Sequence, residues 1–283
     1  MQDANPPPVV ITMPQQSFAE RFKPLHATLT DPEGMFSGSQ MHSDLVALIP
    51  LAKAQGDDSA ELAQLYAALA LLQGKRDEWQ DQQHYGDLAL AIQQRHPVLA
   101  PDEVLGLHYS LSLGAGELEQ PEKVIEHLRA AIAMLPQDKS LSPRQQFGLR
   151  QELGYWLHEQ GRYAEALAYN QQLLADAEAT FGPDEADLTG MLTNLAQNTY
   201  ELKDFARSEA YLQRVVSLAR QHHKFDIEFD GLFQLGVLAH EQGDNAAAEG
   251  YFQQRLAMAR EAEDDYWLER AEEDLAEFKQ RLR

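Results

Sequence analysis

Apolar residues recur along most of this chain with the 3.6-residue period of amphipathic helices, and the predicted helices come in pairs. In each pair, a small residue that follows a leucine marks the first helix. These small residues recur at spacings of 42, 42 and 40 residues, and they are Ser112, Gly154, Ala196 and Gly236. The pattern therefore predicts an all-α chain built from tandem helix pairs.

The small residues have a packing role in this prediction. On the first helix they let a neighbouring helix approach closely, and large apolar residues beside them fill the remaining groove. Gly161 and Gly243 fall in the turn between the two helices, where a left-handed conformation suits glycine. The second helices carry small or branched residues at one shared position, namely Val124, Ala166, Ser208 and Ala248.

The stretch Leu153–Leu167, with the sequence LGYWLHEQGRYAEAL, closely resembles the tetratricopeptide repeat. The step of 40 to 42 residues exceeds the usual repeat of about 34. It is similar to the kinesin-light-chain-type subclass, as is the connecting segment FGPDE at 181–185. The resemblance covers residues 104–260 and implies a right-handed superhelical solenoid of antiparallel helix pairs. It is specific for the fold and says little about function.

The repeat pattern weakens towards both ends of the chain. Residues 62–74 and 77–94 still read as a helix pair, 41–54 as one further helix, and 266–282 as a polar capping helix. The many prolines before residue 40 predict an extended, proline-rich arm over 1–40. We therefore expect a repeat domain, with its capping helix, over 41–283.

In the resembling family, the first helix of each pair lines a concave groove, so equivalent residues form rows along it. A polar row suited to hydrogen bonding with a peptide backbone is Ser110, Glu152, Asn194 and Gln234. Asn194 matches a position where groove-binding members of the family carry asparagine. A mixed row, which could supply side-chain pockets, is Leu113, Tyr155, Gln197 and Val237. A ring row is His158, Tyr200 and His240, and an acidic row is Glu117, Glu159, Glu201 and Glu241.

The acidic row predicts contacts with lysine or arginine side chains of a partner, and the rings beside it could stack on those cations. The alternative is that these glutamates are solvated repeat residues, although the C-terminal end of a helix disfavours an anion. No lysine or arginine occupies the expected groove positions. That argues against a clamp for a partner's C-terminal carboxylate.

Charge and composition narrow the classes of partner. The formal net charge of −22 repels nucleic acid phosphates and anionic lipids, so we expect neither as a partner. No apolar run approaches the length of a membrane span, so we expect no membrane insertion.

No residue pattern points to catalysis or to metal binding. The chain has no cysteine, which excludes disulfides, thiolate catalysis and cysteine metal sites. His158-Glu159 and His240-Glu241 begin like a zinc-protease motif, but no second histidine follows at the fourth position. We therefore expect no enzymatic activity, no catalytic residue, no metal and no cofactor.

The resemblance implies a protein–protein interaction scaffold that binds a protein or peptide, expected to be basic, in its groove. Such a scaffold could be an adaptor, or an immunity protein that neutralises a secreted bacterial toxin. A peptide-sensing regulator is a further alternative, although no output domain is visible. The polar, proline-rich start MQDANPPP has no signal peptide and is similar to the start of a mature exported chain. It favours a periplasmic location over a cytoplasmic one, and the oligomeric state stays open.

Overall fold

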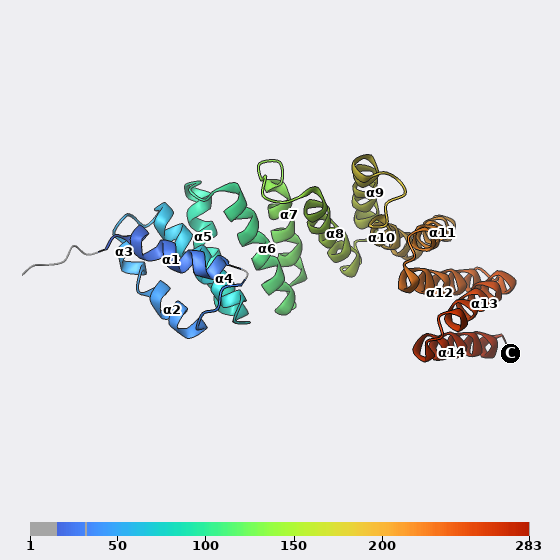
Figure 1. Cartoon of the computed structure of the whole chain (residues 1–283). Helices are drawn as coiled ribbons and strands as arrows, with labels where there is room; N and C mark the ends of the chain where they lie inside the picture. The colour runs from blue at the N-terminus through green and yellow to red at the C-terminus, as the bar shows by residue number, and fades with distance from the viewer. Residues whose placement is uncertain (1–15, 32, 283) are drawn as a thin grey trace, which may run out of the picture. The chain divides into compact units, whose positions relative to one another are not determined.

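The structure, a computed structural model, describes residues 16–31 and 33–282 of the chain (Figure 1). Every regular element in this part of the chain is an α-helix, and consecutive helices stack in pairs. This confirms the all-α repeat fold predicted from the sequence. The contacts divide the chain into two compact units, residues 1–140 and 141–283, called unit 1 and unit 2 below.

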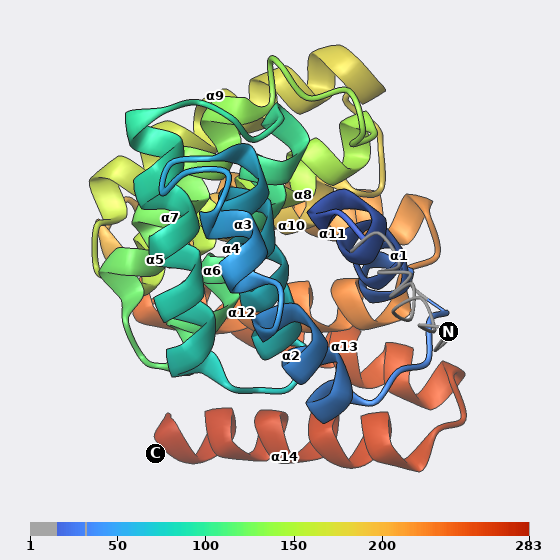
Figure 2. The same cartoon turned by 90° about the vertical axis from the view of Figure 1, so that its left-hand side faces the viewer.

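Unit 1 contains two helix pairs, α4 with α5 and α6 with α7, preceded by three shorter helices. The short helices are α1 (Phe18–Thr30), α2 (Gly38–Val46) and α3 (Ile49–Lys53). The paired helices are α4 (Ala60–Gly74), α5 (Trp79–Arg95), α6 (Pro101–Glu117) and α7 (Pro121–Met134). In Figure 2, α4 and α6 lie between α5 and α7 on one side and α1 on the other.

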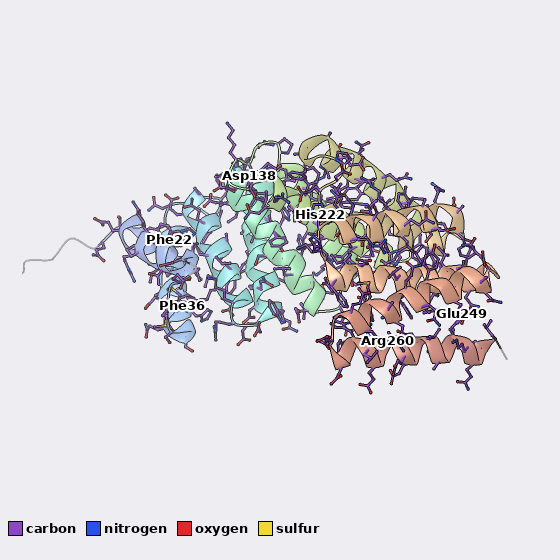
Figure 3. The ribbon with its side chains drawn as sticks, turned by 45° about the vertical axis from the view of Figure 1, so that its right-hand side comes forward. Phe22, Phe36, Asp138, His222, Glu249 and Arg260 are labelled. Carbon is purple, nitrogen blue, oxygen red and sulfur yellow. The ribbon has the colours of Figure 1, made fainter. Side chains whose placement is uncertain are left out.

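The extended arm expected over residues 1–40 is wrong for residues 18–30, which form α1. Ser17 caps this helix, and Ser17 and Glu20 bond reciprocally in a capping box. Phe18, Phe22 and Leu29 are buried in the core of unit 1, which Phe36 also joins (Figure 3). This buried face outweighs the break that Pro24 makes in the helix bonding. Residues 1–15 of the predicted arm lie outside the described residues, and the domain limits stay a prediction.

The position of α1 follows from the composition of α4. Leucines and alanines cover α4 on all sides, so this helix needs apolar neighbours all round. Helices α5 and α6 cover part of it, and α1, α2 and α3 cover the rest. The Lys75 ammonium group also donates to the carbonyl of Leu29 at 2.8 Å, which satisfies the C-terminal end of α1. One face of α4 is therefore occupied by the chain itself.

Unit 2 contains three helix pairs and a final single helix, joined by short connections. The first helices of the pairs are α8 (Pro143–Glu159), α10 (Leu188–Glu201) and α12 (Phe225–Glu241). The second helices are α9 (Tyr163–Phe181), α11 (Phe205–Gln221) and α13 (Asn245–Glu261), and α14 (Asp265–Arg281) follows. Leu275 and Phe278 of α14 are buried against α13, where the sequence placed a terminal helix.

The marker glycines sit where helices approach closely, as the repeat pattern predicted. A Cβ atom on Gly154 would come within 2.0 Å of Asn170 Oδ1, and one on Gly236 within 3.0 Å of the Phe252 ring. The turn glycines also match the expectation, because Gly161 has φ +67° and Gly243 has φ +82°.

Candidate partner-binding surface

The first helices of unit 2 and α14 form the wall of a hollow of about 540 Å³. Its floor is apolar and buried, formed by Ala196, Leu212 and Leu238. Six residues of the predicted binding rows line it, namely His158, Gln197, Tyr200, Glu201, Gln234 and Val237. We call this the main hollow.

A second hollow of about 300 Å³ adjoins the main one between α12, α13 and α14. Phe233 and Val237 of α12 line both hollows and therefore form a ridge between them. The second hollow also brings in His240 and Glu241 from the predicted rows, together with the buried rings of Phe252 and Phe278. A ligand that crosses the ridge contacts both hollows.

The ring row uses its polar atoms to connect neighbouring repeats. His158 Nδ1 lies 2.7 Å from Oδ1 of the buried Asn198, which links α8 to α10. The Tyr200 hydroxyl donates to Glu241 Oε1 at 2.5 Å, which links α10 to α12. This hydrogen bond, with burial and the charge of Glu201, raises the pKa of Tyr200 to about 12, so the hydroxyl stays protonated. The ring faces, rather than the polar atoms, are what these residues can offer a partner.

The acidic row is exposed and largely without a cation. Glu159 and Glu201 are exposed and form no ion pair or hydrogen bond within the described residues. Glu241 is exposed too, and it accepts the Tyr200 hydroxyl but forms no ion pair within the described part of the chain. Among the described residues, unit 2 therefore presents exposed carboxylates that form no ion pair beside the main hollow.

The polar and mixed rows contribute amides and one large ring. Asn194 and Gln234 are half-buried, and Gln197 is exposed. Tyr155 is 48% exposed and stands edge-on to Trp156, with the ring centroids 5.9 Å apart. Glu152 is half-buried and engaged in contacts. The roles of these residues in binding stay a prediction.

The sequence-based prediction missed the contribution of α14 to the main hollow. Arg270 of α14 lines it, and its guanidinium lies 3.5 Å from the carboxylate of Asp230 on α12. Neither Asp230 nor Arg270 belongs to the four rows. Asp230 comes one helical turn before Gln234, and Arg270 lies on α14, which belongs to no helix pair. The signal that could have found Asp230 is a charged residue one turn away from the polar row.

Arg255 of α13 fixes this end of the surface from within the core. Its side chain is 1% exposed, its Nε donates to the carbonyl of Phe229 at 3.0 Å, and it pairs with Asp274 of α14. The guanidinium lies 3.7 Å from the centroid of the Phe229 ring. Burial, and then the charge of Arg270, lowers the pKa of Arg255 to about 10, so it stays charged at neutral pH.

Unit 1 lacks the same open face, because α1 covers α4. A smaller hollow of about 280 Å³ remains beside α1, and Gly106 and Ser110 of α6 line it. Ser110 belongs to the predicted polar row, so this hollow lies on the predicted groove face. His26 and Thr30 of α1 form its other wall. The larger accessible surface on the first helices is therefore in unit 2.

The described residues form neither a metal-binding group nor a membrane-spanning helix. No three histidine, aspartate or glutamate side chains gather there in a group that could hold a metal ion. Among the helices described, none combines the length and apolar character that a bilayer crossing requires.

Comparisons with known proteins agree with the repeat pattern. Residues 148–221 match the tetratricopeptide repeat family model. BtubC (BKLC) from P. vanneervenii has a TM-score of 0.55 and 15% identity, with 81% of this chain and 92% of that chain covered. A putative kinesin light chain from Podosopora anserina also gives 0.55 and 15%, with 71% and 96% covered.

The apo form of RapI gives a TM-score of 0.62 at 8% identity and covers 94% of this chain and 71% of that chain. No curated protein matches the sequence. At these identities the structural similarities establish the fold and no individual function. Residues 148–221 thus carry a tetratricopeptide-repeat match, and the chain shares its fold with tetratricopeptide-repeat proteins of the kinesin-light-chain type.

Proposed function

We propose that unit 2 binds a segment of a basic protein partner across the main and second hollows. Tetratricopeptide repeats generally mediate protein–protein interaction and typically serve as non-catalytic scaffolds, which supports a binding function. The observation that carries the proposal is the pair of joined hollows beside unpaired Glu159 and Glu201.

The shape of the surface supports a ligand with two large side chains. The ridge of Phe233 and Val237 divides a larger from a smaller hollow, and both have apolar walls. An extended segment that crosses the ridge can place one side chain in each hollow. Burial of each such side chain contributes about 1.5–3 kcal/mol of gross stabilisation, before the cost of ordering the segment.

Polar groups at the main hollow support recognition of an extended main chain. Gln197 and Gln234 offer amides that both donate and accept hydrogen bonds.

Charge supports the choice of a basic partner. Glu159 and Glu201 form no ion pair in the described structure, whereas Arg270 in the main hollow is already paired with Asp230. A lysine or arginine of the partner would therefore find an acceptor that costs no existing ion pair. The net charge of −22 would also speed the approach of a basic protein at low salt.

A randomised peptide library tests the proposal, because the protein itself selects the sequences that it binds. The full-length wild-type protein is expected to select peptides enriched in lysine and arginine. The Glu159→Lys plus Glu201→Lys variant is expected to bind those peptides at least about tenfold more weakly, since two attractive contacts become repulsive. Binding by the wild type should also weaken between low and high salt.

The matched control is Glu261→Lys plus Asp184→Lys, which changes the net charge equally but lies outside both hollows. It should retain binding within about threefold, because only the long-range charge is altered. Selection of peptides without basic residues would contradict the choice of partner. Equal loss in both charge variants would contradict the location of the site.

A further inference from the structure

Two histidines face each other across the α6–α7 pair of unit 1. His108 Nδ1 lies 3.1 Å from His127 Nδ1, and the ring centroids are 5.3 Å apart. Along this contact only one nitrogen can carry the shared proton, because the other must accept it. This histidine pair therefore requires at least one neutral ring.

The surroundings hold the pair partly out of water. His127 is buried and His108 is half-buried, and a hollow of about 490 Å³ opens beside them towards α5. The charged groups that face the pair are Asp87 on α5 and Glu126 and Lys123 on α7. Anions thus act on the pair from α5 and α7, and a cation acts on it from α7.

Burial dominates the protonation of both rings. It lowers the pKa of His108 to about 4, with a further contribution from His127. Burial also lowers the pKa of His127, although Glu126 and Asp87 act in the opposite direction. Both rings are therefore neutral at pH 7, which is the state that the 3.1 Å contact needs.

We propose that the histidine pair is a pH-sensitive latch that holds α6 against α7 at neutral pH and loosens in mild acid. Protonation of both rings places two N–H groups and two positive charges against each other, so the rings must separate. In the unfolded chain histidine takes up a proton near pH 6.5, well before the folded pair does. Stability from the pair is thus present above about pH 6.5 and is lost as the pH falls towards 4.

The variant His127→Asn tests the latch, because an amide near the position of Nδ1 can hydrogen-bond to His108 without titrating. Between pH 7.5 and pH 5.0, the thermal unfolding midpoint of the wild type is expected to fall by about 5 °C more than that of the variant. The control is His223→Asn, at an exposed turn position with φ +56° that asparagine adopts readily. It should keep the pH dependence of the wild type. If the unfolding midpoint of His127→Asn falls as much as that of the wild type between pH 7.5 and pH 5.0, the proposal is overturned.

A second measurement uses the unaltered protein and so does not depend on the folding of a variant. Among the ten histidines, NMR titration of the ring carbons should show His108 neutral until about pH 4 and His127 with a pKa below that of an exposed histidine. If all ten histidines titrate near pH 6.5, the contact between His108 and His127 does not lower their pKa, and the latch is rejected.

Discussion

At the scale of single residues, Arg255 shows how one buried charge organises the end of unit 2. It is the charged member of the large, fully buried side chains that the structure describes. Burying an unpaired guanidinium is strongly unfavourable, so its contacts with Asp274, the Phe229 carbonyl and the Phe229 ring must compensate. The same contacts hold α12, α13 and α14 together around the second hollow.

The first prediction concerns the partner of this arginine. The substitution Asp274→Ala should lower the free energy of unfolding by about 2 kcal/mol, because it leaves the buried charge with weaker partners. Urea unfolding measures the change. The control is Glu272→Ala, which removes an exposed pair with Arg260 of α13 (Figure 3) at 4.0 Å and should cost less than about 0.5 kcal/mol. Equal costs for the two variants would contradict the compensation argued for Arg255.

The sequence predicted the rows of equivalent residues but not their hydrogen-bond partners. The recurrence of His158, Tyr200 and Glu241 was visible as rows, because equivalent positions repeat. Their hydrogen-bond partners were not, since His158 meets Asn198 across 40 positions and Tyr200 meets Glu241 across 41. Such pairings depend on how adjacent helices cross, and periodicity alone does not specify that geometry.

At the scale of elements, the helices of unit 2 follow from their periodicity and their small residues. The marker glycines predicted close helix approach, which the contacts of Gly154 and Gly236 confirm. Helix α1 could not be predicted in the same way, because the prolines of this segment favoured an extended arm over a helix. Phe18, Phe22, Leu25 and Leu29 lie on one helical face, and only their burial against the core shows why the helix forms.

The second prediction compares two glycines within α8. Gly148→Ala should raise the free energy of unfolding by about 0.5–1 kcal/mol, since alanine favours the helix and its Cβ meets nothing within 4 Å. Gly154→Ala should instead lower it by about 1–3 kcal/mol, because its Cβ would clash with Asn170 Oδ1. The midpoints of urea unfolding report both changes. Shifts in the same direction would show that close helix approach does not explain the marker glycines.

At the scale of the whole molecule, the two units differ in what their first helices leave accessible. In unit 1, α1 occupies a face of α4, whereas unit 2 keeps two joined hollows on its first helices. The repeat pattern predicted the helix pairs of both units but not this difference. The difference depends on which face of α4 the N-terminal segment covers, and therefore on tertiary packing.

The site was predicted to a smaller extent than the fold. The rows supplied His158, Gln197, Tyr200, Glu201, Gln234 and Val237 of the main hollow. They did not supply Phe233, Asp230 or Arg270, which lie between rows or on the unpaired α14. Helix periodicity marks equivalent positions, while a hollow is bounded by any side chain that reaches it.

The location of the proposed surface can be tested most directly by photo-crosslinking. A library-selected basic peptide with a photoreactive side chain is bound to the full-length protein, and mass spectrometry identifies the attachment sites. The account predicts crosslinks to α10, α12 and α14 around Gln197, Phe233 and Val237, lost with Glu159→Lys plus Glu201→Lys. Crosslinks confined to the second helices α9, α11 and α13, or to unit 1, would contradict it.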